Sequence, residues 1–478
     1  MALGTLVASR LAKLGNVPEG PGPYALALLG AFLLAAAAGW LSRRPEPPGS
    51  EPIPPLAPAP GWARALAGAA ALGLSVWTFF LQRRFEIPLW ALAVWAAAVA
   101  LVPLAFSRTA PRPRRWSPAL LLACAALLAV GASARLMALS RIHPVRAGDE
   151  NAVTMDGLGQ IWRDPNDDPF GMGAQSCAHL SMLPAGIGYL LGSDPIGSPR
   201  VPYGIIGTAA LVAAAGAAAV AGGPEAALFA LALLVLQPQH IHWSRMSDLV
   251  VVDSVTVVAA VLAMLMAYRR GSPRSACFAG IFSGLTFYGY TGGRIMVVVA
   301  LFFLPVLAWG ARAVRPRRAW VLAALTAGFL VAAAPSIHYA TKRFDEWNGR
   351  YNKTSVFFDK EWLPEEVKTQ GSVWAVGLNQ LRLGTIGLLS APSTIHYVGY
   401  PMIAPSILPA LGIAGLAWLL GRGLLAEAYL FGLVVAGNLA VTCLSLSTPQ
   451  PQRGSSLLST LAILGGIAAA GFVSLFPQ

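Results

Sequence analysis

The chain has 478 residues, of which 56% are apolar and 12% are charged, whereas a soluble domain carries about 25% charged residues. Its 34 lysines and arginines exceed its 21 aspartates and glutamates, which gives a formal net charge of +13. The basic residues lie in short loops between long apolar runs, a pattern typical of polytopic membrane proteins and not of a nucleic-acid-binding surface. The composition therefore excludes a soluble globular protein and predicts a membrane protein with no nucleic-acid partner.

The apolar runs predict about thirteen membrane spans, because a helix needs roughly 20 apolar residues to cross a bilayer. In chain order they lie near 24–41, 62–81, 87–107, 117–139, 201–221, 224–238, 249–268, 275–290, 294–311, 319–339, 403–421, 424–446 and 455–476. The predicted fold class is all-α, a polytopic transmembrane helical protein with two long loops, at about 140–200 and 340–402.

The arginines of the short loops predict how the chain is oriented. One set of alternate loops holds fifteen: Arg43, Arg44, Arg64, Arg108, Arg112, Arg114, Arg115, Arg269, Arg270, Arg274, Arg312, Arg315, Arg317, Arg318 and Arg422. The opposite short loops hold five: Arg83, Arg84, Arg245, Arg294 and Arg453. Because arginine is enriched in cytoplasmic loops, the N-terminus and both long loops are predicted outside the plasma (inner) membrane, and the C-terminus in the cytoplasm.

The chain is predicted to divide near residue 116. Residues 45–60 contain eight prolines, a composition that favours a stiff polyproline-type linker. The first three predicted spans carry almost no polar residue, so they look like packing elements. We therefore interpret residues 1–116 as an N-terminal three-span extension with a Pro-rich linker, and residues 117–478 as the catalytic transmembrane core.

The first long loop carries the most informative acidic pair, Asp149 and Glu150, just beyond a predicted span. Carboxylates near a bilayer are costly, so this pair suggests a function. If the segment is helical, Asp156 shares the face of Asp149, and Glu150 points about 100° away. The alternative is a hydrated loop in which these acids pair with nearby arginines.

A second polar stretch surrounds the short loop after the 224–238 span and contains His240, His242, Arg245 and Asp248. The three-residue spacing of Arg245 and Asp248 allows a local ion pair on one helical face, which is the structural alternative. The two histidines have no third ligand nearby, and the four cysteines show no CxxC spacing. No metal site is therefore predicted from the residues themselves.

Further cations lie at span ends on the same predicted side of the membrane: Arg294, Lys342, Arg343 and Arg453. A single basic residue at a helix end commonly reaches out to lipid headgroups, which is the alternative for each of them. Their convergence opposite an acidic loop resembles an anion site beside a base. Tyr288 and Tyr290 precede Arg294 in a loop that is only long enough to turn the chain.

One or two carboxylates facing several cations suit a particular reaction at a membrane surface. A glycosidase needs two carboxyl groups because its leaving alkoxide must be protonated. A sugar attached to a lipid phosphate leaves as a phosphate anion, which needs cations and no acid. One carboxylate then suffices to deprotonate the acceptor hydroxyl. The residues therefore fit glycosyl transfer from a lipid-phosphate sugar.

The order of several motifs resembles the membrane-embedded glycosyltransferases of the C-type (GT-C) fold. In particular the chain is similar to family 39, which includes the protein O-mannosyltransferases and the lipid A aminoarabinose transferases. The motifs are the Asp149-Glu150 pair, Asp168-Pro-Phe-Gly-Met-Gly, Arg200-Val-Pro-Tyr-Gly, Pro238-Gln-His-Ile-His-Trp-Ser-Arg245-Met-Ser-Asp248, Ala279-Gly-Ile-Phe-Ser-Gly284-Leu-Thr-Phe-Tyr-Gly-Tyr290 and Arg294. The resemblance covers about 117–340, and the chain departs from it in having four spans before the Asp-Glu loop where the family usually has one.

The resemblance implies a polyprenyl-phosphate sugar donor, an inverting displacement and a site under the first outer loop. It implies that Asp149 is the base and that Glu150 is a nearby acceptor or positioning group. Arg245 and Asp248 would line the same cavity, as would His242, and Arg294 would help to hold the donor phosphate. Lys342, Arg343 and Arg453 are additional candidates for phosphate contact.

Several points stay open at this stage. The acceptor could be a glycan, a lipid or a protein. Some C-type enzymes depend on a metal, so a divalent metal is not fixed either way and no cofactor is assigned. A transporter or flippase of lipid-linked sugars would also suit a cationic cavity, although the internal repeat that often marks transporters is not found. A structural, partner-anchoring membrane subunit is the third alternative.

Overall fold

The computed structural model describes residues 61–81, 90–106, 116–141, 148–162, 168–310, 317–387, 407–446, 448 and 451–474. The described residues form helices, with two isolated bridges, Met172↔Ala178 and Ser355↔Ser445, as their only β pairing. The all-α class is therefore confirmed. The predicted span at 24–41 and the proline-rich stretch at 45–60 lie outside the described residues.

Seven helical segments of the described chain are long and apolar enough to cross a membrane. They are α5 (Pro118–Leu136), η3 with α8 (Ser198–Gly222), α11 (Val250–Arg270), η4 with α13 (Thr291–Trp309), α14 (Arg318–Lys342), α21 (Leu425–Cys443) and the segment containing α22 (Gln452–Val473). An eighth would be α9 (Pro224–Val235) with α10 (Pro238–Ser244), which meet at a 70° bend.

The other predicted spans within the described residues are also helical. They are α3 (Gly61–Leu81), α4 (Trp90–Ala105), α12 (Pro273–Leu285) and α20 (Ile407–Gly421). The apolar run at 275–290 gives a short helix because a turn begins after Leu285 and leads into η4 (Thr291–Arg294). A count of seven or eight spans is thus supported for the described chain, and the count of about thirteen stays a prediction.

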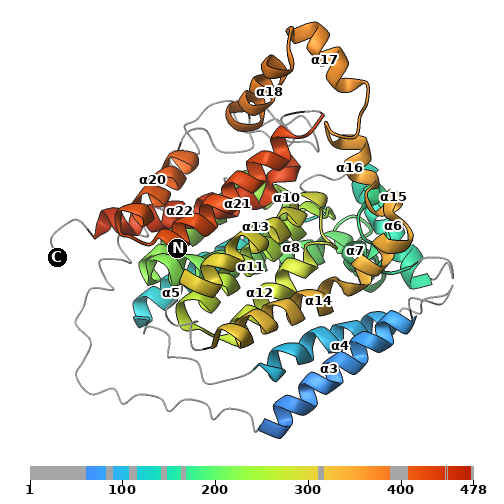
Figure 1. Cartoon of the computed structure of the whole chain (residues 1–478), viewed down its shortest axis with the longest axis horizontal. Helices are drawn as coiled ribbons and strands as arrows, with labels where there is room; N and C mark the ends of the chain where they lie inside the picture. Colours follow the sequence, from blue (N-terminus) through green and yellow to red (C-terminus); the bar gives the residue numbers. More distant parts are fainter. Residues whose placement is uncertain are drawn as a thin grey trace.

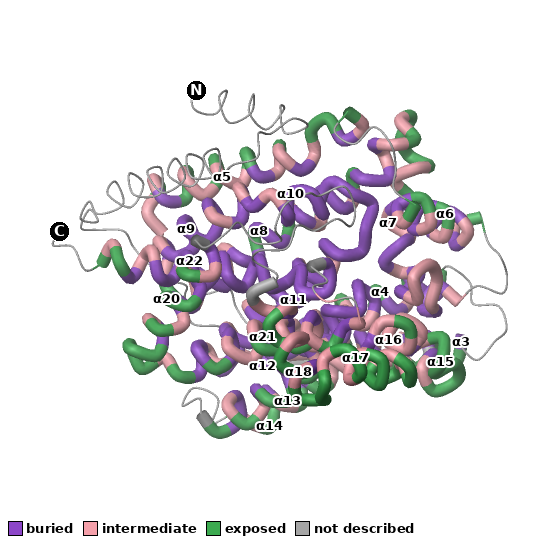
Figure 2. Tube along the Cα trace, turned by 90° about the horizontal axis from the view of Figure 1, so that it is seen from above, coloured by how far each residue is buried: buried purple, intermediate pink, exposed green. Residues whose placement is uncertain are grey.

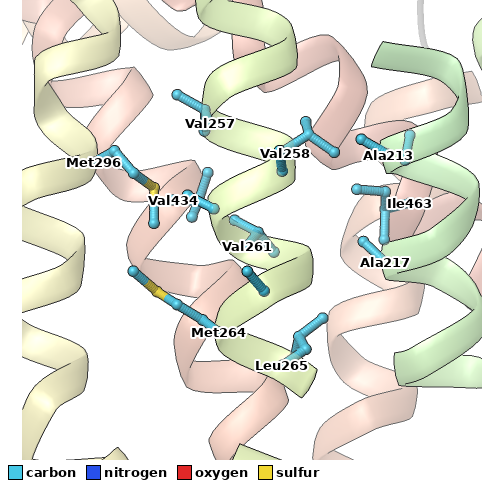
Figure 3. Close-up of a cluster of buried hydrophobic side chains, with 14 of the residues drawn as sticks. Ala213, Ala217, Val257, Val258, Val261, Met264, Leu265, Met296, Val434 and Ile463 are labelled. Atoms are coloured by element: carbon cyan, nitrogen blue, oxygen red, sulfur yellow. The ribbon is translucent and has the colours of Figure 1, made fainter. Parts of the chain in front are cut away.

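Helix α11 runs through the middle of the bundle and is buried along most of its length. Figure 3 shows its valines and Met264 between side chains of α8, α13, α21 and α22. Neighbouring helices approach closely where a small residue lies at the contact. A Cβ on Gly280 of α12 would lie only 2.0 Å from the Leu325 carbonyl oxygen of α14, and one on Gly415 of α20 would lie 2.0 Å from that of Leu464 in α22.

The two ends of the bundle differ in what they carry. At one end, called here the site end, lie α6 (Gly148–Trp162), α7 (His179–Leu191), α15 (Phe344–Trp347) and α16 (Gly349–Thr354), which Figure 1 shows grouped together. Arg245, Arg294 and Arg453 lie at this end. At the opposite end Arg270 is the last residue of α11, Arg318 is the first residue of α14, and Arg422 directly follows α20. The alternation of arginine-rich and arginine-poor loops thus corresponds to the two ends of one bundle.

Helices α3 and α4 pack against each other and both contact α14, and α4 also contacts α12. The Trp95 indole nitrogen donates to the Val331 carbonyl of α14 at 3.0 Å. Its ring lies 5.6 Å from that of Phe170 and 5.3 Å from that of Tyr288, both at the site end. The helix that was predicted to belong to an N-terminal extension therefore supports residues of the core directly, and the division at residue 116 stays a prediction.

Candidate functional site

Glu150 is held by a buried ion pair at the site end. Its two carboxylate oxygens accept hydrogen bonds from Arg200 Nε at 2.9 Å and Arg200 Nη2 at 2.8 Å, and both side chains are only 1% exposed. The Ser247 backbone N–H also donates to Glu150 Oε1 at 2.9 Å, and Arg200 Nη1 donates to the Leu139 carbonyl. This carboxylate joins α6, η3 and the segment after α10, so its geometry is that of a positioning group.

Arg245 caps the C-terminal end of α5 with its side chain. Its Nη1 donates to the Ala134 carbonyl of α5 at 2.7 Å and its Nη2 to the Ala138 carbonyl at 3.0 Å. The last carbonyls of a helix have no hydrogen-bond partner within the helix, so the Arg245 guanidinium satisfies one of them, that of Ala134. Its positive charge also interacts favourably with the negative end of the helix dipole. Burial, and secondarily the nearby Arg200, lowers the pKa of Arg245 to about 10.

The bend between α9 and α10 is braced by a second buried arginine. Arg135 of α5 donates to the Leu234 carbonyl near the end of α9 at 3.2 Å and contacts His240 Nδ1 at 2.9 Å. Since a guanidinium only donates hydrogen bonds, His240 accepts at Nδ1 and carries its proton on Nε2, which lies 3.1 Å from Ser254 Oγ. The brace fixes the direction in which α10 delivers Arg245 and Ser247.

Asp253, in the first turn of α11, holds the turn that carries Arg294. Its Oδ2 accepts a hydrogen bond from the Gly293 N–H at 2.6 Å, and the residue is 1% exposed. A Cβ on Gly289 or Gly293 would approach Asp253 Oδ1 to 2.3 or 2.6 Å, and one on Gly292 would lie 2.1 Å from the Arg453 carbonyl. The glycines of this turn are therefore required by close packing between α11 and the start of the last span.

Arg294 projects from this turn into an aromatic environment and is 7% exposed. Its guanidinium carbon lies 4.3 Å from the Trp347 ring centroid and 5.6 Å from that of Tyr351. Its hydrogen-bond acceptors are the Trp347 carbonyl at 3.3 Å and the Met172 sulfur at 3.9 Å. All of these acceptors are neutral.

Two further arginines meet at the hydroxyl of Tyr290. Arg350 of α16 donates to Tyr290 Oη at 3.1 Å, and Arg453, which is 7% exposed, donates to the Thr354 carbonyl at 3.1 Å and to Ser445 Oγ. Burial raises the pKa of Tyr290, whereas the charges of Arg350 and Arg453 act to lower it, which places both cations close to this phenol. We call Arg294, Arg350 and Arg453 the arginine cluster.

Cys177 lies near two of the three cluster arginines, Arg294 and Arg350. Burial raises the pKa of its thiol to about 12, against the effect of the Arg294 and Arg350 charges and with that of Asp253 and Asp248. All four side chains thus lie within electrostatic range of one sulfur atom.

The segment that delivers Cys177 is under backbone strain. Gln175 and Ser176 both have positive φ, at 58° and 55°, and each such non-glycine residue costs of order 1–3 kcal/mol. The Asp156 carboxylate accepts a hydrogen bond from Ala174 N, and Met172 pairs with Ala178, so the surrounding structure holds this conformation. The strained segment places Met172 and Cys177 against the arginine cluster.

Asp149 starts α6 beside the cluster and is half-buried. The pKa of Arg350 is raised because the effects of Tyr290, Cys177 and Asp149 together exceed the lowering effect of burial. Asp149 is therefore a carboxylate close to a cluster arginine, whereas Glu150, one residue on, is engaged by Arg200.

The remaining predicted residues lie in different places. His242 and Asp248 are buried on and after α10. Lys342 and Arg343 end α14 and are exposed, and their charges act on Asp168. Arg343 pairs with Glu346 at 3.4 Å. Among the predicted cations, then, Arg294 and Arg453 are brought into the cluster, and Lys342 and Arg343 are set beside Asp168.

Arg350 was not predicted from the sequence, because it lies in a long polar loop where nothing in the local pattern distinguishes it from its charged neighbours. Arg200 appeared only as part of the Arg200-Val-Pro-Tyr-Gly motif. Within the described parts of the chain, no group of three His, Cys, Asp or Glu side chains is arranged to hold a metal ion.

The arrangement concentrates positive charge, and the carboxylates of Asp149 and Asp253 lie near it. The three salt bridges among the described residues join Arg200 to Glu150, Arg269 to Glu427 and Arg343 to Glu346, so none involves the arginine cluster. The Nε atoms of the three cluster arginines are buried without a hydrogen-bond partner. Buried charges are normally paired, so the cluster has the chemistry of a binding site for an anion.

Comparison with known proteins gives a likeness of fold. No family model and no curated protein sequence matches the chain. Its structure is similar to that of an oligosaccharyltransferase from Archaeoglobus fulgidus crystallised with Zn and sulfate, at 17% identity and a TM-score of 0.48, over 74% of this chain and 49% of that one. A second structure, of the archaeal oligosaccharyltransferase AglB with an inhibitory peptide and a dolichol-phosphate, matches at 14% identity and a TM-score of 0.47, over 73% and 50%. The chain thus spans about half the length of these proteins.

Proposed function

We propose that the protein is an integral membrane glycosyltransferase that moves a sugar from a polyprenyl-phosphate donor to an acceptor hydroxyl. The observation that carries the proposal is the arginine cluster, which joins Arg294 and Arg453 at the starts of two candidate membrane spans with Arg350 of α16 and has only neutral hydrogen-bond acceptors among the described residues. Arginine suits phosphate because its planar guanidinium offers several donors in a fixed geometry. A lipid phosphate is the anion that naturally reaches this depth, since its chain lies in the bilayer.

The position of Asp149 supports the choice of reaction. In an inverting displacement the Asp149 carboxylate takes the proton of the acceptor hydroxyl while the acceptor oxygen forms a bond to the anomeric carbon. The bond from that carbon to the donor phosphate oxygen breaks, and the phosphate leaves with the bonding electron pair. Arg294, Arg350 and Arg453 would then stabilise the developing negative charge, which is the largest single contribution in many enzymes.

The proposed roles of the other residues follow from their contacts. Asp253 positions Arg294 through the Gly293 N–H, and Glu150 positions α6, and hence Asp149, through Arg200. We propose the outer face of the plasma membrane as the location of the site, on the basis of the arginine-poor short loops at the site end. The acceptor, whether glycan, lipid or protein, would approach from the same side as Asp149.

The proposal is tested first by binding. The purified protein in proteoliposomes is titrated with a polyprenyl phosphate and with the uncharged polyprenol, for wild type and for Arg294→Gln, Arg350→Gln and Arg453→Gln. Each substitution should weaken phosphate binding about 10- to 100-fold, since a hydrogen bond to a charged group contributes about 1.5–3 kcal/mol. Arg382→Gln, an exposed arginine of α18 (Val373–Arg382) outside the cluster, is the matched control and should leave binding unchanged.

The same proteoliposomes then receive a panel of labelled polyprenyl-phosphate sugars. Consumption of one donor by wild type but not by Asp149→Asn would support glycosyl transfer with this base. Equal affinity for polyprenyl phosphate and polyprenol would contradict the anion site. Movement of labelled lipid between leaflets without consumption would favour a flippase instead.

A further inference from the structure

Helix α18 in the second long loop presents large apolar side chains on its outward face. Trp374, Leu378 and Leu381 are 84%, 65% and 53% exposed. Residues at spacings of four and three share one helical face. The less exposed residues of α18 are Val376, which is 2% exposed, and its neighbours Ala375, Asn379 and Gln380. A surface helix in water carries charged and polar residues on its outward face instead.

The segment from Val356 to Gly384, called here the excursion, contains α17 and α18. Both of its ends are attached to the site end of the span α21. At its start, the Val356 N–H donates to the Leu444 carbonyl at 3.1 Å, and the Leu446 N–H donates to the Thr354 carbonyl at 2.9 Å. At its end, Thr442 Oγ1 donates to the Gly384 carbonyl at 3.1 Å, and a Cβ on Gly384 would lie 2.4 Å from Cys443 Sγ. The excursion therefore leaves and returns within one turn of a membrane-span terminus.

Exposed aromatic residues mark the same boundary. Phe357 and Phe358 directly follow the attachment to Leu444 and are 72% and 51% exposed. The charged residues of α17 (Trp362–Gln370), such as Glu365 and Lys368, lie between these phenylalanines and α18 in sequence. Figure 1 shows α17 and α18 projecting from the bundle, and Figure 2 shows stretches of exposed residues on both helices. Tryptophan is enriched at the membrane–water interface, and phenylalanine occurs on the apolar faces of segments that lie in it.

We infer that α18 lies in the lipid surface at the site end, with Trp374, Leu378 and Leu381 inserted between headgroups and acyl chains. The occupant of this face is the bilayer because the face adjoins a span terminus at both attachments and is apolar without a charged centre. Amphipathic helices bind in this way when a continuous apolar face meets the interface. This placement would hold the second loop, which carries Arg350, against the leaflet from which a lipid substrate enters. It does not depend on the proposed reaction and would hold for a transporter as well.

The inference is tested with single cysteines labelled with a nitrobenzoxadiazole fluorophore in proteoliposomes. The four native cysteines are replaced by alanine, and labels are placed at Trp374, Leu378 or Leu381, with Glu365 and Lys368 of α17 as matched exposed controls. At the α18 positions, doxyl-labelled lipids should quench the emission several-fold more than at the controls, and iodide should quench it several-fold less.

Iodide quenching at Trp374 equal to that at Glu365 would overturn the inference, because it would place α18 in water. Protection of the α18 labels from both iodide and doxyl lipid would also overturn it, because a protein surface would then cover the helix. Labelling at single exposed positions avoids disturbing the packing, and a circular-dichroism spectrum equal to wild type confirms that each labelled protein is folded.

Discussion

Asp149 and Glu150 are adjacent carboxylates with different surroundings. We propose different tasks for them, and their replacement by the isosteric amides should separate the two. Asp149→Asn removes a half-buried charge beside Arg350 and leaves the packing of α6 intact. Glu150→Gln removes a charge that Arg200 contacts through two hydrogen bonds at 1% exposure. The first change should therefore affect chemistry, and the second should affect folding.

The expected loss of folding stability in Glu150→Gln follows from the contacts of this side chain. The glutamine carbonyl can still accept from Arg200 Nε and the Ser247 N–H, but its NH₂ group then faces Arg200 Nη2, which is also a donor. Removing one partner of a buried ion pair leaves the other charge uncompensated and costs about 3–5 kcal/mol. For Asp149→Asn, the loss of an exposed or half-exposed charge changes stability by less than about 1 kcal/mol, whereas loss of a general base lowers turnover about 10²- to 10⁴-fold.

Both variants are purified in detergent, and the thermal unfolding midpoint, the yield of monodisperse protein and the transfer rate are measured. Glu150→Gln should lower the midpoint and the yield, and the protein that does fold should keep far more turnover per molecule than Asp149→Asn, because its base is still present. Asp149→Asn should match wild type in midpoint and yield and lack turnover. The reasoning is refuted if Glu150→Gln unfolds like wild type while abolishing transfer, since that would make Glu150 the reacting carboxylate.

Three further predictions concern single sites. Gly293→Ala should weaken polyprenyl-phosphate binding at least about tenfold, because the added Cβ would lie 2.6 Å from Asp253 Oδ1. The control Gly432→Ala, whose Cβ would have no atom within 4 Å, should bind as wild type does. Equal binding by the two variants would contradict the role of the turn. Burial raises the pKa of Asp168 from 3.8 to about 6. Between pH 4 and 6 the folded protein therefore holds a proton that the unfolded chain releases. The free energy of unfolding should fall by up to about 3 kcal/mol over this range and then stay level. Denaturation at pH 4 and pH 7 should show this fall in wild type and not in Asp168→Asn. Arg245→Ala should lower the unfolding midpoint through the loss of two charged hydrogen bonds, of about 1.5–3 kcal/mol each, with donor affinity unchanged; a large loss of affinity in stable protein would show that Arg245 binds substrate instead.

The sequence by itself determined the class of protein and the two ends of its bundle. Hydropathy needs only the local chain, because each span must satisfy its own backbone hydrogen bonds in lipid, and all predicted spans within the described residues are helical. The same local rule grouped Arg294 and Arg453 at one end, since a residue that follows an even number of crossings returns to the same side. Helix periodicity also separated the faces of Asp149 and Glu150.

Only the tertiary structure decided which of these residues meet. Glu150 pairs with Arg200, fifty positions away, and Arg245 caps α5, more than a hundred positions away. Arg350 joins the cluster from the second loop, whereas Lys342, eight positions before it, lies beside Asp168 instead. Such partnerships depend on how the helices pack against one another, and a residue's own neighbours in sequence carry no record of that packing.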